Sequence, residues 1–172
     1  MKRERYSIIY SSKTGNTKKL AEAIYNTLPQ NECSYYGTVD KIDDELSNVI
    51  YIGFWTEKGN ADLLTLEFLK KLKNKKIFLF GTAGYGESEK YFEGIINNLK
   101  KNIDSSNTII GTFMFQGKMP LSVRERYEKM REQNNISLNI DKLIANFDKA
   151  LSHPDEDDLK TLEEIILSGV MY

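Results

Sequence analysis

The feature that most restricts the fold of this chain is the regular alternation of short apolar runs with longer segments of helical periodicity. The apolar runs are rich in β-branched and aromatic residues, and Val49–Trp55 (VIYIGFW) is the clearest of them. Runs without polar alternation are typical of strands that helices cover on both faces. Between the runs, apolar side chains recur at helical spacing. Strands that alternate with helices in this way predict βαβ units and a parallel sheet.

Five strands and three helices are expected in the first two-thirds of the chain. We place the strands at residues 6–10, 34–39, 49–55, 77–80 and 108–115. The helices between them are expected at residues 16–28, 61–72 and 88–103, with Leu63 and Leu66 on the inner face of the second. This succession predicts a doubly wound α/β sandwich.

The last third of the chain is different in character and reads as mostly helical. A charged helix is expected at residues 121–132 and another at residues 141–151. A final helix begins after Pro154, where four acidic residues suit the positive end of the helix dipole. We expect this helix to complete the sheet. Residues of about 116–152 then form a helical excursion after the fifth strand, within a single domain of residues 1–172.

Composition and charge exclude several classes of function. The chain has 172 residues, with 24 Lys and Arg against 25 Asp and Glu, so no basic excess indicates nucleic acid. The single cysteine, Cys33, can form neither an internal disulfide nor a zinc cage. No apolar run approaches the ~18 residues of a membrane span, and no secretory signal is evident. We expect a soluble cytoplasmic protein with no nucleic-acid or membrane partner.

The stretch that carries chemistry is the loop Ser12–Thr17 (SKTGNT), between the first strand and the first helix. In an open α/β sheet, ligands bind outside the carboxyl ends of the strands, where this loop lies. Its hydroxyls, its backbone N–H groups and the helix N-terminus suit an anion. It is not a P-loop, because the sequence G-x-x-x-x-G-K-[ST] is absent. Neutral donors favour a phosphate monoester that is held and not transferred; the alternative is a Ser/Thr-rich turn that caps a helix.

The loops after the third and fourth strands are expected to flank the same crevice. Each carries an aromatic residue, Trp55 or Tyr85, that can stack on a planar ring. Gly59, Gly84 and Gly86 would let the backbone approach such a ring closely. The alternative is that both aromatic residues only pack within the protein.

At this point the sequence resembles a known family. The residues Ile8–Thr17 (IIYSSKTGNT), with Ala21 and Ile24 behind them, are similar to the FMN-phosphate signature of the flavodoxins. The resemblance implies a flavodoxin-like five-stranded parallel sheet of order 2-1-3-4-5 and FMN as the cofactor. It implies phosphate contacts from Ser12, Lys13, Thr14, Gly15, Asn16 and Thr17. It implies ring contacts from Trp55, Thr56, Lys58, Gly59, Asn60, Thr82, Ala83, Gly84, Tyr85 and Gly86.

The resemblance also implies a function. Flavodoxins transfer electrons one at a time, which implies an electron-transfer protein that supplies a partner reductase and is an electron carrier more than a stand-alone enzyme. Small shuttle flavodoxins are strongly acidic, whereas this chain has a net charge of −1, which suggests a dedicated partner. The excursion resembles that of a subgroup of flavodoxin-like proteins found with bilirubin reductase. Its charged residues, Arg124 and Arg126 among them, are expected to form a docking surface.

Two other functions remain open on the residues alone, because fold does not determine function. The protein could be an FMN-dependent oxidoreductase that uses NAD(P)H to reduce a quinone or a flavin. It could also be an interaction module that has kept the fold without the flavin. Oxidation of NAD(P)H by the purified protein separates the first of these from a carrier, and the colour of the protein tests the second.

Overall fold

The computed structural model describes residues 4–42, 45–86, 88–133 and 139–169. The strands are β1 (Tyr6–Tyr10), β2 (Cys33–Thr38), β3 (Val49–Glu57), β4 (Asn60–Ala61), β5 (Lys76–Ala83) and β6 (Thr108–Gln116). The α-helices are α1 (Asn16–Thr27), α2 (Leu63–Leu69), α3 (Glu89–Lys100), α4 (Leu121–Glu132), α5 (Ile140–Ala150) and α6 (Glu156–Gly169). Single 3₁₀ turns lie at Gln30–Glu32 and Val39–Lys41.

The sheet has the predicted topology. Its parallel strands lie in the order β2-β1-β3-β5-β6, which is 2-1-3-4-5 when these five are numbered along the chain. The short strand β4 was not expected; it pairs antiparallel with the end of β3. As a result α2 begins at Leu63 and not at residue 61, and it has only 7 residues. Leu63, expected on the inner face, is 66% exposed, while Leu69 is fully buried.

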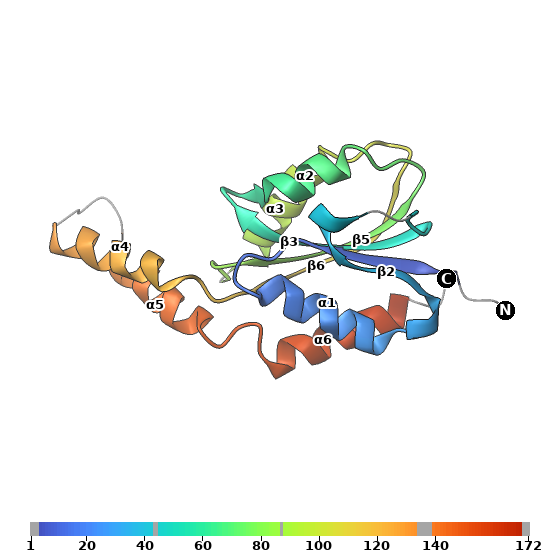
Figure 1. Cartoon of the computed structure of the whole chain (residues 1–172). Coiled ribbons are helices and arrows are strands. Elements are labelled where there is room, and N and C mark those ends of the chain that lie inside the picture. Colours follow the sequence, from blue (N-terminus) through green and yellow to red (C-terminus); the bar gives the residue numbers. More distant parts are fainter. Residues whose placement is uncertain (1–3, 43–44, 87, 134–138, 170–172) are drawn as a thin grey trace.

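Helices cover both faces of the sheet, which creates two cores (Figure 1). Helices α2 and α3 pack on one face, and α1 and α6 on the other. Alternate residues of β1 serve the two cores: Ile8 faces α1 and α6, whereas Ile9 faces α2 and α3. Both side chains are fully buried. The continuous apolar runs of the sequence thus have their physical reason in a sheet that helices cover on both faces.

Side-chain caps fix where several helices begin. Asp62 accepts hydrogen bonds from the backbone N–H and the hydroxyl of Thr65 and so starts α2. At α6, Asp155 and Asp158 accept from each other's backbone N–H groups, which is a reciprocal capping box. His153 Nδ1 lies 2.6 Å from a carboxylate oxygen of Asp158 and belongs to this cap.

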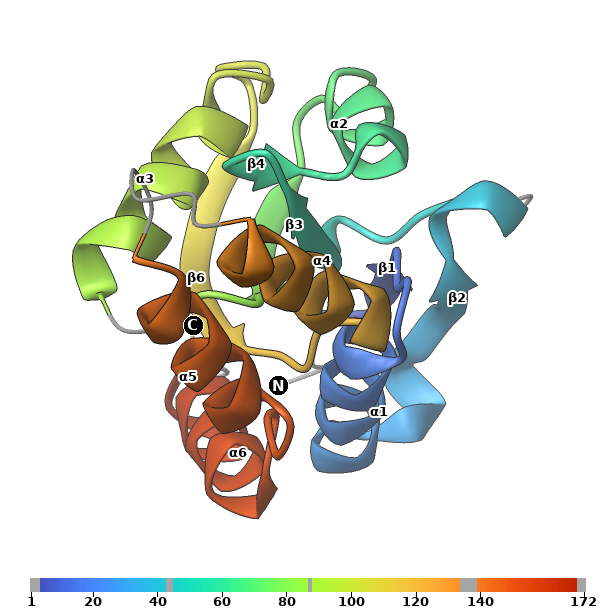
Figure 2. The same ribbon diagram turned by 90° about the vertical axis from the view of Figure 1, so that its left-hand side faces the viewer.

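Helices α4 and α5 form an antiparallel pair, here called the helical hairpin, that projects beyond one end of the sheet (Figure 1). Figure 2 looks onto that end and shows the hairpin in front of the strands. It is the expected excursion between β6 and α6. The guanidinium of Arg124 in α4 contacts Glu128 at 3.1 Å and Asp148 in α5 at 3.3 Å, which links the two helices. Within the described residues, none of the helices is both long and apolar enough to span a bilayer.

Candidate functional site

The loop Ser12–Thr17 joins β1 to α1 at the carboxyl edge of the sheet, as predicted. The N–H of Ser11 donates to the carbonyl of Gly53, which ties the start of the loop to β3. Gly15 then turns the chain with a φ of 88°, a left-handed value that a residue without Cβ adopts readily. A Cβ at this position would meet open space, so it is the backbone angle that favours glycine here.

The N-terminus of α1 presents donors and no competing acid. Its first helical hydrogen bond runs from Lys19 N–H to the Gly15 carbonyl, so the N–H groups before it have no acceptor inside the helix. Lys18 N–H is taken by the hydroxyl oxygen of Ser12 at 3.2 Å. The N-cap residue, Gly15, has no side chain that could accept a hydrogen bond, and the first turn of the helix has no acidic residue. Such an N-terminus attracts an anion through both its N–H groups and its dipole.

Thr17 and Thr82 are arranged differently from what the sequence suggested. Thr17 is buried and its hydroxyl donates to the Phe54 carbonyl at 3.1 Å. Since that hydroxyl has one proton, it accepts at its other contact, the hydroxyl of Thr82 at 3.1 Å. Thr82 is also buried. Both side chains therefore join the loop to the sheet behind it, and only the backbone of Thr17 is left to face a ligand.

A hollow of about 210 Å³ lies against the loop. Its lining residues are Thr14, Gly15, Asn16, Lys19, Lys118, Leu151, Ser152, His153 and Pro154. The Lys19 ammonium donates to the Pro154 carbonyl at 2.6 Å, and Asn16 donates to the Lys118 carbonyl at 2.9 Å. The hollow thus has two lysines at its border. Its far wall is the root of the helical hairpin, by which we mean residues 116–120 before α4 and 151–154 after α5. This setting favours a negatively charged group.

The end of β3 brings an aromatic ring and an unpaired hydroxyl to the same edge. Trp55 is half-buried, and the ammonium of Lys13 lies over its ring, 4.9 Å from the centroid. This cation–π contact connects the loop Ser12–Thr17 to the next loop along the sheet. Beside it, the hydroxyl of Thr56 is buried and has no hydrogen-bond partner within the described residues. A buried polar atom without a partner is costly unless something completes it.

Lys58 and Gly59 form the turn between β3 and β4. Both have left-handed φ, 50° and 75°, and the flanking Glu57 and Asn60 pair across it, so it is a two-residue hairpin of the I′ kind. Asn60 accepts from the next N–H, that of Ala61, through its side chain. The side chain of Asn98 in α3 donates to the Gly59 carbonyl at 3.0 Å.

The loop after β5 holds the second expected aromatic residue. Tyr85 is 39% exposed and meets Tyr91 of α3 edge-to-face, with 5.3 Å between ring centroids. Burial raises the pKa of Tyr91, and the neighbouring phenols of Tyr127 in α4 and Tyr85 raise it further. Ala83 is buried at the end of the strand. The loop is therefore bordered by both α3 and the helical hairpin.

Gly84 and Gly86 have a packing role that the sequence did not predict, and their approach to a flavin ring stays a prediction. A Cβ on Gly84 would lie 2.5 Å from Cγ of Met119, and one on Gly86 would lie 2.6 Å from Cδ of Gln116. The space freed by these glycines is thus filled by the root of the helical hairpin. Sequence reasoning expected it to admit a flavin ring.

Three residues at this edge were missed by sequence reasoning: Asn98, Gln116 and Asn146. Each donates a side-chain hydrogen bond to a backbone carbonyl in a loop of the site. Their partners are 32 to 62 positions away in the chain, except that Gln116 also contacts Asn146 at a separation of 30. No motif or periodicity signals such contacts, because they depend on how α3 and the helical hairpin pack against the loops.

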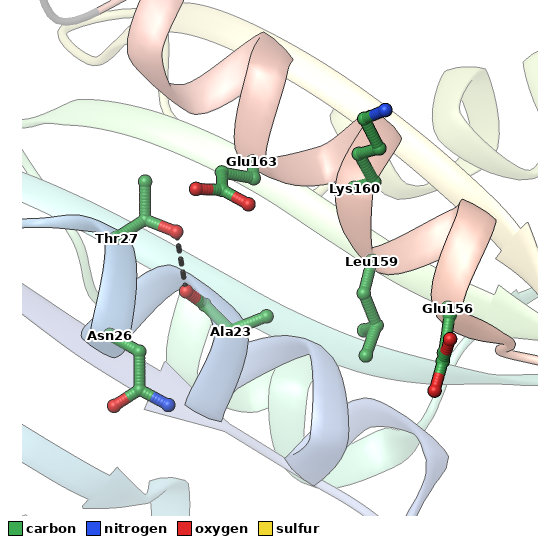
Figure 3. A pocket seen from close by; sticks show the side chains of 7 residues that line it. All are labelled: Ala23, Asn26, Thr27, Glu156, Leu159, Lys160 and Glu163. Atoms are coloured by element: carbon green, nitrogen blue, oxygen red, sulfur yellow. Dashed lines mark hydrogen bonds between the residues drawn. The ribbon is translucent and has the colours of Figure 1, made fainter.

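A larger hollow, of about 310 Å³, lies between α1 and α6 (Figure 3). Its lining residues are Ala23, Asn26, Thr27, Glu156, Leu159, Lys160 and Glu163. The Thr27 hydroxyl is used within α1, where it donates to the Ala23 carbonyl at 2.7 Å. None of the lining residues belongs to the loops at the carboxyl edge of the sheet, so we assign this hollow no part in the site.

The arrangement of loop, strand order and edge has a clear counterpart among known proteins. A family model described as "Flavodoxin domain" matches residues 7–167. This chain belongs to the flavodoxin domain family. A solved structure of a flavodoxin from the domain Archaea shares the fold, with a TM-score of 0.56, 14% identity and 96% of each chain covered. The fold of this flavodoxin-domain protein is thus α/β and flavodoxin-like, with extra helices toward the C-terminus.

Two relatives of this flavodoxin-domain protein match nearly their whole length. Both are named flavodoxin-like domain-containing protein BilS. The one from Clostridium symbiosum (strain WAL-14163) is 36% identical over 182 aligned positions, which cover 96% of each chain. The one from Clostridioides difficile (strain CD3) is 35% identical over 159 positions, which cover 88% of each chain. The similarity extends through the helical hairpin, since coverage on this scale includes the region after β6.

Proposed function

We propose that this protein binds FMN and carries electrons singly to a partner reductase. One observation carries the proposal: a helix N-terminus with a glycine cap and no acidic residue in its first turn lies beside a hydroxyl-bearing loop at the carboxyl edge of a flavodoxin-like sheet. A phosphate monoester fits this cradle, because Ser12, Thr14 and the backbone N–H groups can all donate to it. The border lysines, Lys19 and Lys118, suit an anionic ligand.

Each part of the edge has a role in this proposal. The loop Ser12–Thr17 holds the phosphate and so fixes one end of FMN. Trp55 and Tyr85, with the backbone around Gly59 and Gly84, flank the ring and limit the access of water. FMN, when bound, supplies a centre that accepts and gives electrons one at a time. The protein's own residues bind and orient it, and the half-exposed aromatic rings leave an edge open to a partner.

The partner is, on this proposal, a dedicated reductase. A net charge of −1 argues against a general shuttle that relies on strong charge steering. Both relatives carry the same name, BilS, and their similarity includes the hairpin region. This supports the narrower resemblance to flavodoxin-like proteins found with bilirubin reductase, and we propose bilirubin reductase as the enzyme to test first.

The test begins with the purified protein. We expect it to be yellow and to release FMN, and not FAD, when denatured. With NAD(P)H alone it should not turn over, whereas the reduced protein mixed with the partner reductase should transfer electrons at a rate that rises with its concentration.

Three results would overturn the proposal in different ways. Release of FAD, or no flavin uptake after incubation with FMN, removes the cofactor assignment. Unaided, multiple-turnover oxidation of NAD(P)H with a quinone or flavin identifies an enzyme in its own right. A yellow protein that fails to reduce the partner removes the partner assignment alone.

A further inference from the structure

Two buried side-chain amides lie between the helical hairpin and the loop after β5. Gln116, at the end of β6, is 8% exposed, and Asn146, in α5, is 4% exposed. Gln116 Nε2 donates to the carbonyl of Gly84 at 3.1 Å, and Asn146 Nδ2 donates to the same carbonyl at 3.0 Å. Gln116 Nε2 also donates to Asn146 Oδ1 at 3.0 Å. The three groups form a closed network in which one backbone oxygen accepts two bonds.

This network lies directly beyond the last backbone hydrogen bond of the sheet. The N–H of Gly117 donates to the carbonyl of Ala83, which is the last backbone bond between the segment after β6 and β5. Gly84, the next residue, has no neighbouring strand to bond with. Among the described residues, the two amides are the donors found for its part-buried carbonyl, and an acceptor that loses its donors away from water is costly. The side chains of Gln116 and Asn146 therefore supply, for one further residue, the hydrogen bonds that a neighbouring strand supplies within the sheet.

The orientation of the carbonyl sets the orientation of the next N–H. A trans peptide bond is planar, so the Gly84 carbonyl and the Tyr85 N–H point in opposite directions. With the carbonyl held by the amide pair, the Tyr85 N–H points away from it. Glycine at position 84 would otherwise let this peptide turn with little cost. The two amides therefore restrict the rotation of the Gly84–Tyr85 peptide that glycine at position 84 would allow.

Packing supports the same restraint. The side chain of Met119 occupies the space that a Cβ on Gly84 would need, and the side chain of Gln116 occupies that of Gly86. The segment of residues 116–119 also reaches the loop Ser12–Thr17, since Asn16 donates to the Lys118 carbonyl. The root of the hairpin thus contacts both loops that, on the proposed function, hold opposite ends of the cofactor.

We propose that Gln116 and Asn146 are positioning residues, which fix the Gly84–Tyr85 peptide so that the loop of residues 84–86 is pre-shaped for the ring of FMN. The inference rests on the proposed function and extends it: the helical hairpin is a component of the flavin site. A loop that is already ordered loses less conformational entropy on binding, which raises affinity without a new contact.

The decisive variant is Asn146→Asp. It keeps the acceptor for Gln116 but removes the donor to Gly84, and it sets a carboxylate against that carbonyl. Asn26→Asp is the matched control, because it makes the same change on an exposed position of α1. Gln116→Glu is the second variant, which removes the other donor to Gly84.

We would titrate the flavin-free proteins with FMN and with riboflavin. Asn146→Asp and Gln116→Glu should each weaken FMN and riboflavin equally, by roughly five- to tenfold for the loss of one donor to the Gly84 carbonyl. Equal factors are expected because the altered loop touches the ring that the two ligands share. Asn26→Asp should change neither affinity.

A second readout needs no ligand. In the amide ¹H–¹⁵N spectrum of the flavin-free Asn146→Asp protein, the Tyr85 and Gly86 signals should shift or broaden, whereas those of Thr14 and Gly15 should stay in place. Unaltered Tyr85 and Gly86 signals, unaltered flavin affinities, or a loss confined to FMN would each overturn the proposal. Wild-type protein that binds no flavin would instead show that the proposed function itself has failed.

Discussion

At the scale of single residues, side chains of one type do different work in the same short loop. Ser12 Oγ accepts from Lys18 N–H at the helix start and keeps its own proton for a ligand. Thr14 lines the hollow beside the loop. Thr17, three residues later, gives its proton to the sheet. The sequence predicts that this loop has hydroxyls, but not which of them points outward, because that depends on the depth at which α1 packs.

Replacing Thr14 with Val should weaken FMN binding and leave riboflavin binding nearly unchanged. Loss of one hydrogen bond from the hydroxyl to the charged phosphate should reduce the binding free energy of FMN by roughly 1.5–3 kcal/mol. Riboflavin has no phosphate, so it makes no such bond and loses none. Fluorescence titration of the flavin-free protein measures both.

Thr17→Val serves as the comparison for this measurement. It should lower the free energy of unfolding by roughly 1–3 kcal/mol, since the buried hydrogen bond from Thr17 to the Phe54 carbonyl is lost. If Thr14→Val weakens the two flavins equally, the loop is structural and not a phosphate cradle.

At the scale of elements, the β3–β4 turn and the helical hairpin are the two parts that adapt a common sheet to this protein. In the turn, a lysine adopts a left-handed φ that suits glycine or asparagine. Proline at Gly59 is incompatible with the observed φ of 75°, so that change would break the turn itself. In the hairpin, Arg124 is a link between α4 and α5. The sequence predicts that Arg124 belongs to a docking surface, but a substitution there would also break the link between α4 and α5. Arg124 is therefore unsuited to a test of docking.

Lys58→Asn should stabilise the protein. Asparagine tolerates the left-handed conformation, and an Asn-Gly pair is the preferred sequence of a I′ turn. The gain should be up to about 1 kcal/mol in the free energy of unfolding, measured by urea denaturation. Lys58→Val is the opposite control, because a β-branched residue fits this φ poorly; a gain in that variant would contradict the turn assignment.

Arg126→Glu tests the hairpin as a docking surface. Arg126 is exposed and contacts the ring of Tyr127, so reversing its charge leaves the α4–α5 link intact. Transfer to the partner reductase should slow at low salt, with FMN affinity unchanged. The slowing should shrink as salt rises, because exposed charges are screened beyond about 10 Å at 0.1 M.

Lys160→Glu on α6 is the matched reversal for this experiment, away from the carboxyl edge of the sheet. Rates for Arg126→Glu that equal the wild type at low salt would show that the partner docks elsewhere.

At the scale of the whole molecule, the predictable part is what local pattern determines. The parallel strands, the helix pair after β6 and the final helix follow from apolar periodicity and from helix-start signals such as Pro154 with its acids. The loop Ser12–Thr17 could be located because its residues are contiguous. The amide pair, Gln116 and Asn146, could not, because its meaning arises only when α5 docks against the loop after β5. The short β4 was missed for a related reason: two residues show no period.

The position of Trp55 gives the molecule an optical signal of its own. The chain has one tryptophan, and it stands at the edge of the site with the Lys13 ammonium over its ring. Light emitted by the protein under indole excitation therefore comes from a single known place. A ligand or partner that displaces the ammonium or packs against the indole changes the intensity and the wavelength of the tryptophan fluorescence. Events at this edge can thus be timed in a rapid-mixing instrument, with no dye attached to the protein.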